Sequence, residues 1–290
     1  MKRIMIYLFL GLLCYPAILQ ANTVDFTYIK KYAELANIVY SNAVEVDSFI
    51  LKHGGKLIRY HTIPETQVSY FLSRDLDQKK QSISVRGTAN LENVLVDLEF
   101  KLQQNKTVNI PLHQGFSEAA KAIYDDIIPH LNQNLTITIT GHSLGGAIAV
   151  ILAMYLDSAH YSVDSVITFG QPKVTNVAGA AAFKHLHLIR VVTTLDLVPV
   201  VPPFDPIEIK NTDIFWHLGT EIILLQGSYY SVTSGISSML RAAKFFTQVP
   251  NEDNLENHKM QYYLELINAK LDNAIEEPYK NELEILSWFD

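Results

Sequence analysis

Ser143 is the residue whose type and neighbours most clearly indicate chemistry. It is the central residue of a G-x-S-x-G sequence at residues 141–145. Residues 136–140 alternate apolar and polar side chains, as a strand does, and the Ala- and Leu-rich residues 147–156 predict a buried helix. A serine on a sharp turn between a strand and a helix is typical of a nucleophile elbow, which presents the hydroxyl for attack on a carbonyl.

The neighbours of Ser143 fit the needs of such a turn. The elbow strains the serine backbone, and a side chain two residues before or after it would collide, so glycine at Gly141 and Gly145 removes the collision. The backbone N–H of Leu144 is expected to donate to the negative charge that develops on a substrate oxygen. We expect His142 to pack or hydrogen-bond locally rather than act as a base. The alternative for the whole segment is a glycine-rich structural turn.

A serine hydroxyl needs a base, and the base needs an acid that orients it. Where such an elbow is found, the acid follows the serine along the chain and the histidine follows the acid. Asp196 comes just after residues 188–194, which predict a buried strand. Asp205 and Asp213 are later alternatives without a preceding strand, and Asp196 could instead cap the turn before Pro199.

Two histidines, His217 and His258, follow Asp196. We expect His217 to begin a strand with its ring satisfied, since the apolar residues 221–225 follow it. His258 precedes a short helical pattern, and a loop-borne histidine there can reach the elbow. Position therefore favours His258 over His217 as the base.

Eight segments carry a resemblance to a known family, in the order in which that family has them. They are residues 84–88 (a strand and oxyanion turn), 93–98 (a lid segment), 113–116 (H-x-G-F), the elbow, 169–172 (F-G-x-P), 196–199 (D-x-V-P), 216–221 (H-x-G-x-E), and Asn257-His258 with Tyr262, which is one residue later than in the family's D-H-x-x-Y. From about residue 28 to residue 263 the sequence resembles the class 3 lipases, the fungal-lipase-like branch of the α/β-hydrolases. It departs from their pattern at Val94, Thr175 and Asn257, where the family often has tryptophan, glycine and aspartate.

The resemblance implies an α/β-hydrolase fold, with a mostly parallel central sheet, helices on both faces and a helical lid. It also implies that Thr88 holds the oxyanion together with Leu144. An ordinary exit from a strand into a turn is the alternative for residues 86–88.

Residues 91–102 have the spacing of an amphipathic helix. Apolar side chains recur along one face at Leu91, Val94, Leu95, Leu98 and Leu102. Periodicity alone favours a surface helix that packs on the core. The resemblance indicates instead a mobile lid that covers the pocket in water and opens at lipid, although Val94 weakens the expectation of a large aromatic seal.

Length and composition agree with one large α/β domain at residues 22–290. The chain has 290 residues, of which 48% are hydrophobic and 18% charged. Strand-like and helix-like runs alternate from residue 82 onward, which favours a mostly parallel sheet.

The first residues are typical of an export signal. Lys2 and Arg3 precede the apolar residues 4–19, and Ala21 offers a cleavage point. The apolar run is shorter than the roughly 20 residues of a transmembrane helix. We expect residues 1–21, which include the one cysteine, Cys14, to be removed and the protein to be secreted or periplasmic. A retained anchor is the alternative.

Charge and motifs argue against several classes of function. The formal net charge is −7, which disfavours nucleic acid as a partner, and the sequence contains no metal-ligand spacing, phosphate loop or dinucleotide motif. We expect no cofactor, a monomer, and hydrophobic contact with a lipid–water interface. The elbow and the resemblance together predict a serine hydrolase of lipid carboxylic esters, of the triacylglycerol lipase or phospholipase type. An acyltransferase with the same residues and an inactive lipid-binding relative are the alternatives.

Overall fold

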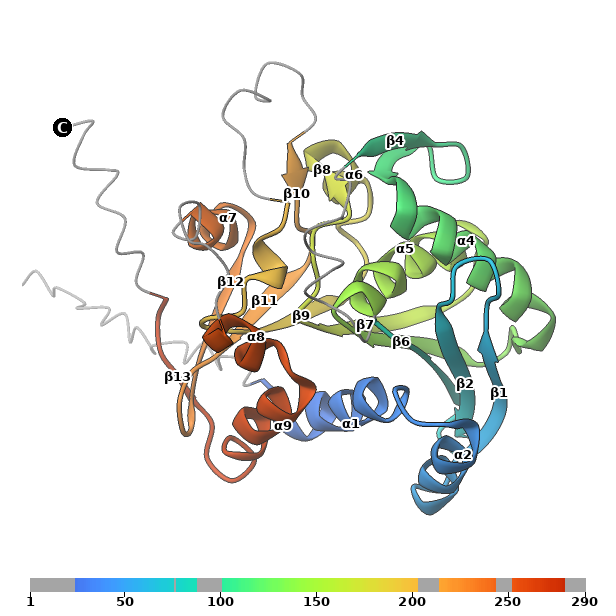
Figure 1. Cartoon of the computed structure of the whole chain (residues 1–290), viewed down its shortest axis with the longest axis horizontal. Helices are drawn as coiled ribbons and strands as arrows, with labels where there is room; N and C mark the ends of the chain where they lie inside the picture. Colours follow the sequence, from blue (N-terminus) through green and yellow to red (C-terminus); the bar gives the residue numbers. More distant parts are fainter. Residues whose placement is uncertain (1–23, 76, 88–100, 203–213, 244–251, 280–290) are drawn as a thin grey trace, which may run out of the picture.

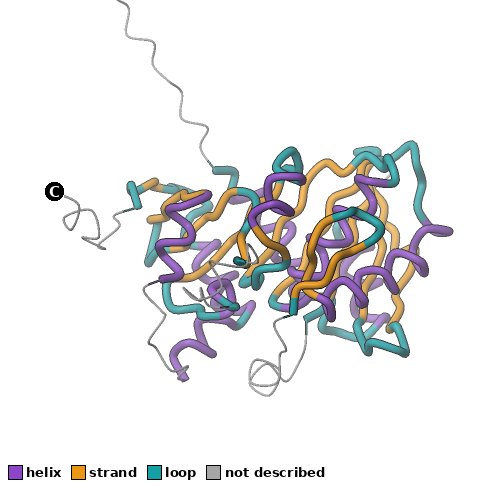
Figure 2. The backbone as a smooth tube through the Cα atoms, turned by 90° about the horizontal axis from the view of Figure 1, so that it is seen from above, coloured by secondary structure: helices purple, strands orange, loops and turns teal. Residues whose placement is uncertain are grey.

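A nine-stranded sheet forms the centre of the molecule. The computed structural model describes residues 24–75, 77–87, 101–202, 214–243 and 252–279. Within them the strands of this sheet follow the order β1-β2-β3-β6-β7-β9-β11-β12-β13. They are β1 (Lys56–Thr62), β2 (Ser69–Asp75), β3 (Lys80–Val85), β6 (Thr136–His142), β7 (Val163–Phe169), β9 (Leu188–Thr193), β11 (Thr220–Leu224), β12 (Tyr229–Ser234) and β13 (Ile275–Glu276). Figure 2, seen from above, shows these strands extending across the described molecule.

The middle of the sheet is parallel. Strands β3, β6, β7, β9 and β11 pair with one another in parallel register, whereas β1, β2 and β12 join by antiparallel pairs nearer the edges. Parallel neighbours need a crossover on a face of the sheet, and α5 (Leu144–Ser158) is that crossover between β6 and β7. The prediction of a mostly parallel α/β sheet is confirmed.

Helices cover both faces of this sheet, as Figure 1 shows. On one face α4 (Gln114–Ile127) and α5 pack into one apolar cluster with the strands. On the other, a second cluster contains α1 (Phe26–Ile38), α2 (Ala43–Lys52) and α9 (Met260–Asn268). Every residue of α5 from Gly145 to Leu156 is buried, which explains why the sequence shows a continuous apolar run there instead of a stripe.

A second, smaller sheet accompanies the first and has no counterpart in the sequence-based expectations. Its order is β10-β8-β5-β4 and its pairs are antiparallel. The strands are β4 (Leu102–Asn105), β5 (Ile110–His113), β8 (Thr175–Asn176) and β10 (Phe215–Trp216). Because each has only two or four residues, alternation of side chains along them is too short to see in a sequence.

Short helices complete the described part of the chain. They are the 3₁₀ turns η1 (Ile128–His130) and η2 (Val198–Val200), and the helices α6 (Val177–Ala182), α7 (Gly235–Ala243) and α8 (Glu252–His258). Of these, η2 and α8 lie next to the candidate active-site residues described below.

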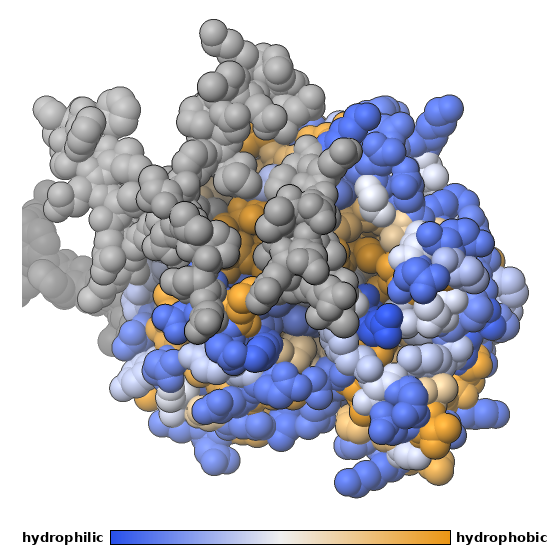
Figure 3. Space-filling model, viewed as in Figure 1, coloured by the Kyte–Doolittle hydropathy of each residue, from blue (hydrophilic) through white to orange (hydrophobic). Residues whose placement is uncertain are grey.

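The face of the molecule shown in Figure 3 is mostly hydrophilic over the described residues. Apolar side chains come to the surface at its lower right, where Figure 1 places α2. On that helix Val44 is 75% exposed and Leu51 is 72% exposed. In the part of the chain that the structure describes, none of the helices has both the length and the apolar character to cross a membrane.

Candidate active site

Ser143 lies on the turn between β6 and α5. Its φ of +59° and ψ of −134° fall where a non-glycine residue is strained by roughly 1–3 kcal/mol. Two backbone hydrogen bonds hold the turn. The Ser143 N–H donates to the Phe169 carbonyl at 2.8 Å, and the Ser143 carbonyl accepts from the Gly146 N–H at 2.9 Å. The surrounding backbone therefore imposes the conformation of the serine.

The glycines of the elbow leave space that a side chain would fill. A Cβ built on Gly141 would lie 2.5 Å from the Gly145 carbonyl oxygen, and one built on Gly145 would lie 2.3 Å from the Val85 carbonyl oxygen. At Gly146 the corresponding distance is 3.1 Å, to Gln171 Cβ. The contacts at 141 and 145 are with backbone atoms, which cannot move aside, and they are the physical reason for glycine at both positions.

The structure brings Asp196 and His258 together. Asp196 follows β9 and His258 ends α8, and Asp196 Oδ2 lies 2.8 Å from His258 Nδ1. Both side chains are buried, with exposures of 0% and 5%. The expectation that His258 lies on a loop is wrong, because the last residue of a helix carries the ring into the site.

Two further hydrogen bonds tie α8 to the end of β9. Asn254 Nδ2 donates to the Leu195 carbonyl at 2.8 Å, and Thr193 Oγ1 donates to the Asn257 carbonyl at 3.0 Å. Each joins the segment that leads to Asp196 to the helix that carries His258. The pair is thus held by its backbone as well as by its side chains.

Two other donors hold the Asp196 carboxylate. The Val198 N–H donates to Oδ1 at 2.8 Å, and the Tyr263 hydroxyl donates to Oδ2 at 2.6 Å. The family resemblance places Tyr262 in the segment that follows His258, whereas the residue that contacts the carboxylate is Tyr263. The Tyr262 hydroxyl accepts from Gln226 Nε2 at 2.7 Å in an exposed contact.

The spacing of apolar residues in α9 could have identified Tyr263. Met260, Tyr263 and Ile267 are buried and follow the i, i+3, i+7 spacing of one helix face. Successive helical residues point about 100° apart, so Tyr263 lies within the buried cluster while Tyr262 is only partly buried at its edge. The sequence therefore contained a signal for the missed residue.

Ser143 Oγ and His258 Nε2 are both buried, and neither makes a hydrogen bond within the described residues. The segment Phe169-Gly170 contacts both residues, because Phe169 accepts the Ser143 N–H and a Cβ built on Gly170 would lie 2.8 Å from His258 Cε1. A hydroxyl and an imidazole nitrogen that both have unused hydrogen-bonding capacity are the groups that a nucleophile and its base require.

Backbone donors lie beside Ser143. Leu144 is the first residue of α5, and the first N–H groups of a helix have no acceptor within it. Gly87, after β3, reaches the same place, since a Cβ built there would lie 3.1 Å from Ser143 Cβ. Thr88, the next residue, lies outside the described residues.

Other expectations also fall outside the described residues. They are the lid positions Leu91, Val94, Leu95 and Leu98, and the signal peptide predicted at residues 1–21.

His142 makes long-range hydrogen bonds, so the expectation of local bonding is wrong. Its Nδ1 lies 2.9 Å from the Tyr40 hydroxyl, and its Nε2 lies 2.7 Å from the His258 carbonyl oxygen. Burial lowers the pKa of His142 well below its ordinary value. The ring is therefore neutral near pH 7.

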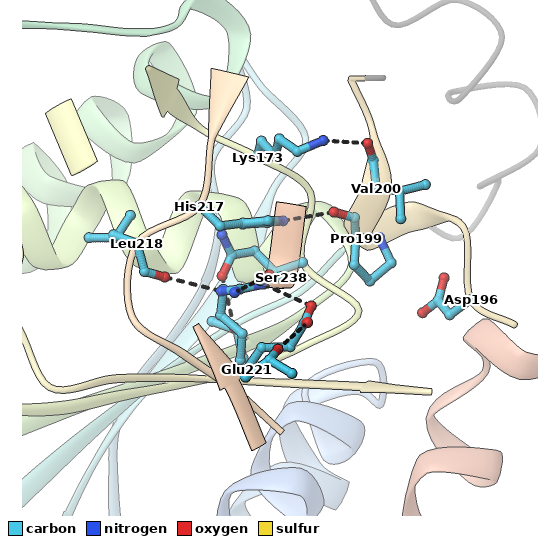
Figure 4. Close-up of polar contacts among 12 residues, drawn as sticks. Lys173, Asp196, Pro199, Val200, His217, Leu218, Glu221 and Ser238 are labelled. Carbon is cyan, nitrogen blue, oxygen red and sulfur yellow. Dashed lines mark hydrogen bonds and ion pairs between the residues drawn. The ribbon is translucent and has the colours of Figure 1, made fainter. Parts of the chain in front are cut away.

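Lys173 and His217 make hydrogen bonds to the backbone of the loop after Asp196, as Figure 4 shows. Lys173 Nζ donates to the carbonyls of Val200 and Pro202, and His217 Nε2 donates to the Pro199 carbonyl at 2.7 Å. Burial lowers the pKa of His217 well below its ordinary value, so this ring is also neutral near pH 7.

His217 lies between β10 and β11 and does not begin a strand, contrary to expectation. Its hydrogen bond to Pro199 holds the backbone that follows Asp196.

A buried ion pair completes the polar contacts in Figure 4. Arg190 Nη1 lies 3.2 Å from Glu221 Oε1, and both side chains are 1% exposed. Arg190 also donates to the Leu218 carbonyl and to Ser238 Oγ, each at 3.0 Å. These bonds join β9, β11 and α7 beneath the loop that carries Asp196.

Within the residues that the structure describes, no group of three or more His, Cys, Asp or Glu side chains has an arrangement that could hold a metal ion.

Comparisons with known proteins agree with this geometry. Residues 82–205 match the model of the family described as Lipase (class 3). A lipase of Rhizopus niveus is 27% identical over 206 residues, which cover 64% of this chain and 53% of that protein. The chain thus spans about half the length of the curated lipases it matches. A chloroplastic phospholipase A1 of Arabidopsis thaliana is 25% identical over 153 residues, which cover 48% of this chain and 24% of that protein.

The fold is also similar to that of lipases of known structure. The crystal structure of a lipase from Rhizopus microsporus var. chinensis is 25% identical, with a TM-score of 0.60 over 69% of this chain and 74% of that one. Residues 82–205 of this chain thus match the class 3 lipase family, and the chain has the α/β-hydrolase fold of lipases of known structure.

Proposed function

We propose that this chain is a serine hydrolase that cleaves carboxylic esters of lipids, with acylglycerols or glycerophospholipids as substrates. The observation that carries the proposal is a strained, buried Ser143 that contacts the same Phe169-Gly170 segment as the His258 ring, which Asp196 orients at 2.8 Å. The match of residues 82–205 to the class 3 lipases supports the reaction class, and the names of the relatives, a lipase and a phospholipase A1, support lipid esters as the substrate class.

In the proposed reaction Ser143 Oγ attacks the ester carbonyl while His258 Nε2 takes its proton. Asp196 stabilises the imidazolium through Nδ1. The ester C–O bond then breaks, and His258 returns the proton to the leaving alcohol. Water attacks the acyl-enzyme in the second half, again giving a proton to His258, and the fatty acid is released as Ser143 recovers its proton.

Two backbone positions are proposed to stabilise the negative charge on the substrate oxygen. The Leu144 N–H is the first, because it follows the nucleophile at the start of α5. Thr88 is the second, and its proposed role rests on the family resemblance together with the proximity of Gly87 to Ser143. Loss of one such donor typically lowers turnover by about 10²–10³.

The proposed lid rests on the apolar spacing of Leu91, Val94, Leu95 and Leu98. We expect residues 89–102 to exchange backbone amides faster with solvent in the presence of micelles than in buffer. Equal protection under both conditions would argue against a lid.

We infer export from the basic start and the apolar residues 4–19. N-terminal sequencing of protein recovered from the medium or the periplasm tests this. A chain that begins after Ala21 is expected, and a chain that retains residues 1–21 would contradict cleavage.

The test of the function is initial rate against concentration for a short-chain and a long-chain ester, with wild type and Ser143→Ala in parallel. We expect wild type to hydrolyse ester and Ser143→Ala to lose several orders of magnitude in turnover. A rise in rate when the long ester forms droplets would identify a lipase that acts at interfaces. A smooth curve on the short ester alone would identify an esterase.

The same preparation separates the alternative chemistries. Product analysis with added alcohol distinguishes transfer from hydrolysis, because a transferase would yield a new ester in place of fatty acid. Full activity in Ser143→Ala, or failure of wild type to react with a fluorophosphonate, would overturn the proposal.

A further inference from the structure

Two hydrogen bonds through one imidazole ring connect Tyr40, which follows α1, with the helix end that carries His258. The Tyr40 hydroxyl lies 2.9 Å from His142 Nδ1, and His142 Nε2 lies 2.7 Å from the His258 carbonyl oxygen. The Tyr40 hydroxyl also lies beside the turn after β3, since a Cβ built on Gly87 would be 2.6 Å from it. The elbow and the proposed base are therefore joined through the His142 ring.

Elementary hydrogen-bond rules fix the direction of every bond in this series. The His258 carbonyl can only accept, so His142 Nε2 carries the hydrogen. A neutral imidazole then has an acceptor at Nδ1, so the Tyr40 hydroxyl donates to it. All of these donors and acceptors are thus matched in one tautomer.

Packing around the ring favours this state. The His142 side chain is 7% exposed, its ring centroid lies 4.4 Å from that of His258, and Tyr263 packs against it edge-on at 6.1 Å. A doubly protonated His142 would have no acceptor nitrogen for the Tyr40 hydroxyl. Its positive charge would also lie next to the His258 imidazole, which must itself accept a proton. Burial, which lowers the pKa of His142, acts in the same direction.

We propose that His142 is a positioning residue, held as the Nε2–H tautomer by Tyr40, that fixes the backbone of His258 and thereby aims the base at Ser143. The inference rests on the proposed function of Ser143 and His258. It assigns to the residue before the nucleophile a role apart from the shape of the turn. A misplacement of about 1 Å in a catalytic group can cost on the order of 10² in rate, so the effect should appear in kcat.

Two substitutions at position 142 separate donor geometry from side-chain volume. In His142→Gln the amide nitrogen is four bonds from Cα, as Nε2 is, and can still donate to the His258 carbonyl. In His142→Asn the amide is one bond shorter, so it can meet Tyr40 but cannot reach His258. We expect His142→Asn to lower kcat roughly ten- to hundredfold with little change in KM, and His142→Gln to retain most of it.

Tyr40→Phe tests the other end of the series. It keeps the ring and removes the hydroxyl, so His142 is no longer confined to one tautomer. We expect a smaller loss of kcat than in His142→Asn, and no further loss when the two are combined, since both act through the same bond to His258. Tyr262→Phe is the matched control, because its hydroxyl accepts from Gln226 in an exposed contact, and it should match wild type.

A spectroscopic measurement makes the inference independent of activity. The ring ¹⁵N signals of His142 should show one Nε2–H tautomer in wild type and a mixture in Tyr40→Phe. A wild-type ring that exchanges between tautomers, equal losses in His142→Gln and His142→Asn, or full activity in a folded His142→Asn would overturn it. If wild type hydrolyses no ester, the proposed function fails, and the ¹⁵N spectrum still decides the tautomer.

Discussion

The Tyr263 hydroxyl and His258 Nδ1 meet at the same oxygen of Asp196, at 2.6 Å and 2.8 Å from Oδ2. With the Val198 N–H on Oδ1, the carboxylate accepts from a helix, a loop and the proposed base. Three acceptor contacts at a fully buried carboxylate leave it little freedom to rotate. The direction of the Asp196–His258 bond is thus set in part by Val198 and Tyr263.

Tyr263→Phe should lower turnover without unfolding the protein. The ring keeps its edge-on contact with Phe169, while Asp196 loses one donor. A hydrogen bond to a charged group contributes about 1.5–3 kcal/mol, so we expect kcat for a soluble ester to fall about tenfold or more. Tyr262→Phe, one residue away and with its hydroxyl in an exposed bond to Gln226, serves as the control. Equal kcat values in the two variants would refute a role for Tyr263 at the site.

Ser143 offers a test of backbone strain that is separate from catalysis. Ser143→Gly and Ser143→Ala both remove the hydroxyl and should both be inactive. Glycine tolerates φ of +59°, whereas alanine retains strain of roughly 1–3 kcal/mol, and the greater freedom of glycine in the unfolded chain offsets about 0.5–1 kcal/mol of the difference. We expect Ser143→Gly to unfold at higher urea concentration than Ser143→Ala. The reverse order would mean that the elbow is not strained.

The parts of the site that the sequence predicted are those fixed by short-range geometry. The elbow needs glycine within two residues of Ser143 and a strand and helix on either side, so a few consecutive letters specify it. Asp196 could be chosen because a buried strand precedes it. For these residues the local sequence carries nearly all of the structural constraint.

The parts that the sequence missed depend on contacts between distant segments. His142 bonds Tyr40 and His258, which are 102 and 116 residues away, and no local pattern records such partners. The choice between Tyr262 and Tyr263 depended on which face of α9 is buried, and the resemblance did not settle a shift of one residue. The small sheet was not predicted because its strands come from distant parts of the sequence and are too short to show an alternation of apolar and polar side chains.

Gly145 and Gly115 should respond in opposite ways to the same change. In Gly145→Ala the added carbon would lie 2.3 Å from the Val85 carbonyl oxygen, so the elbow must open, and we expect a loss of several kcal/mol in stability or failure to fold. In Gly115→Ala the nearest atom is 3.9 Å away, at His113 Cε1. This position is in α4, where alanine should gain about 0.5–1 kcal/mol.

Urea unfolding of the two alanine variants checks both statements. Gly115 belongs to the H-x-G-F segment through which the chain resembles its family, so tolerance there would show that the motif does not require glycine for steric reasons. A destabilised Gly115→Ala would instead indicate a contact that α4 makes only with other parts of the chain. A stable and active Gly145→Ala would contradict the close approach of β3 to the elbow.

Stability should fall as the pH drops below the ordinary histidine pKa. Burial lowers the pKa of His113 from 6.5 to about 4, and burial also lowers those of His142 and His217. Between these values the unfolded chain binds protons that the folded chain does not, so the free energy of unfolding decreases as pH falls from 6.5 toward 4. Above pH 6.5 the contribution of these rings to stability is fully present. For His113 we expect a loss on the order of 2–3 kcal/mol.

His113→Asn isolates this contribution from the helix cap. His113 Nδ1 accepts from the Phe116 N–H at the start of α4, and asparagine, a favoured N-cap residue, can accept the same bond without titrating. Urea unfolding at pH 7.5, 6 and 5 should show a shallower loss of stability in His113→Asn than in wild type, with part of the slope retained because His142 and His217 remain. Parallel curves for the two proteins would mean that folding does not lower the pKa of His113.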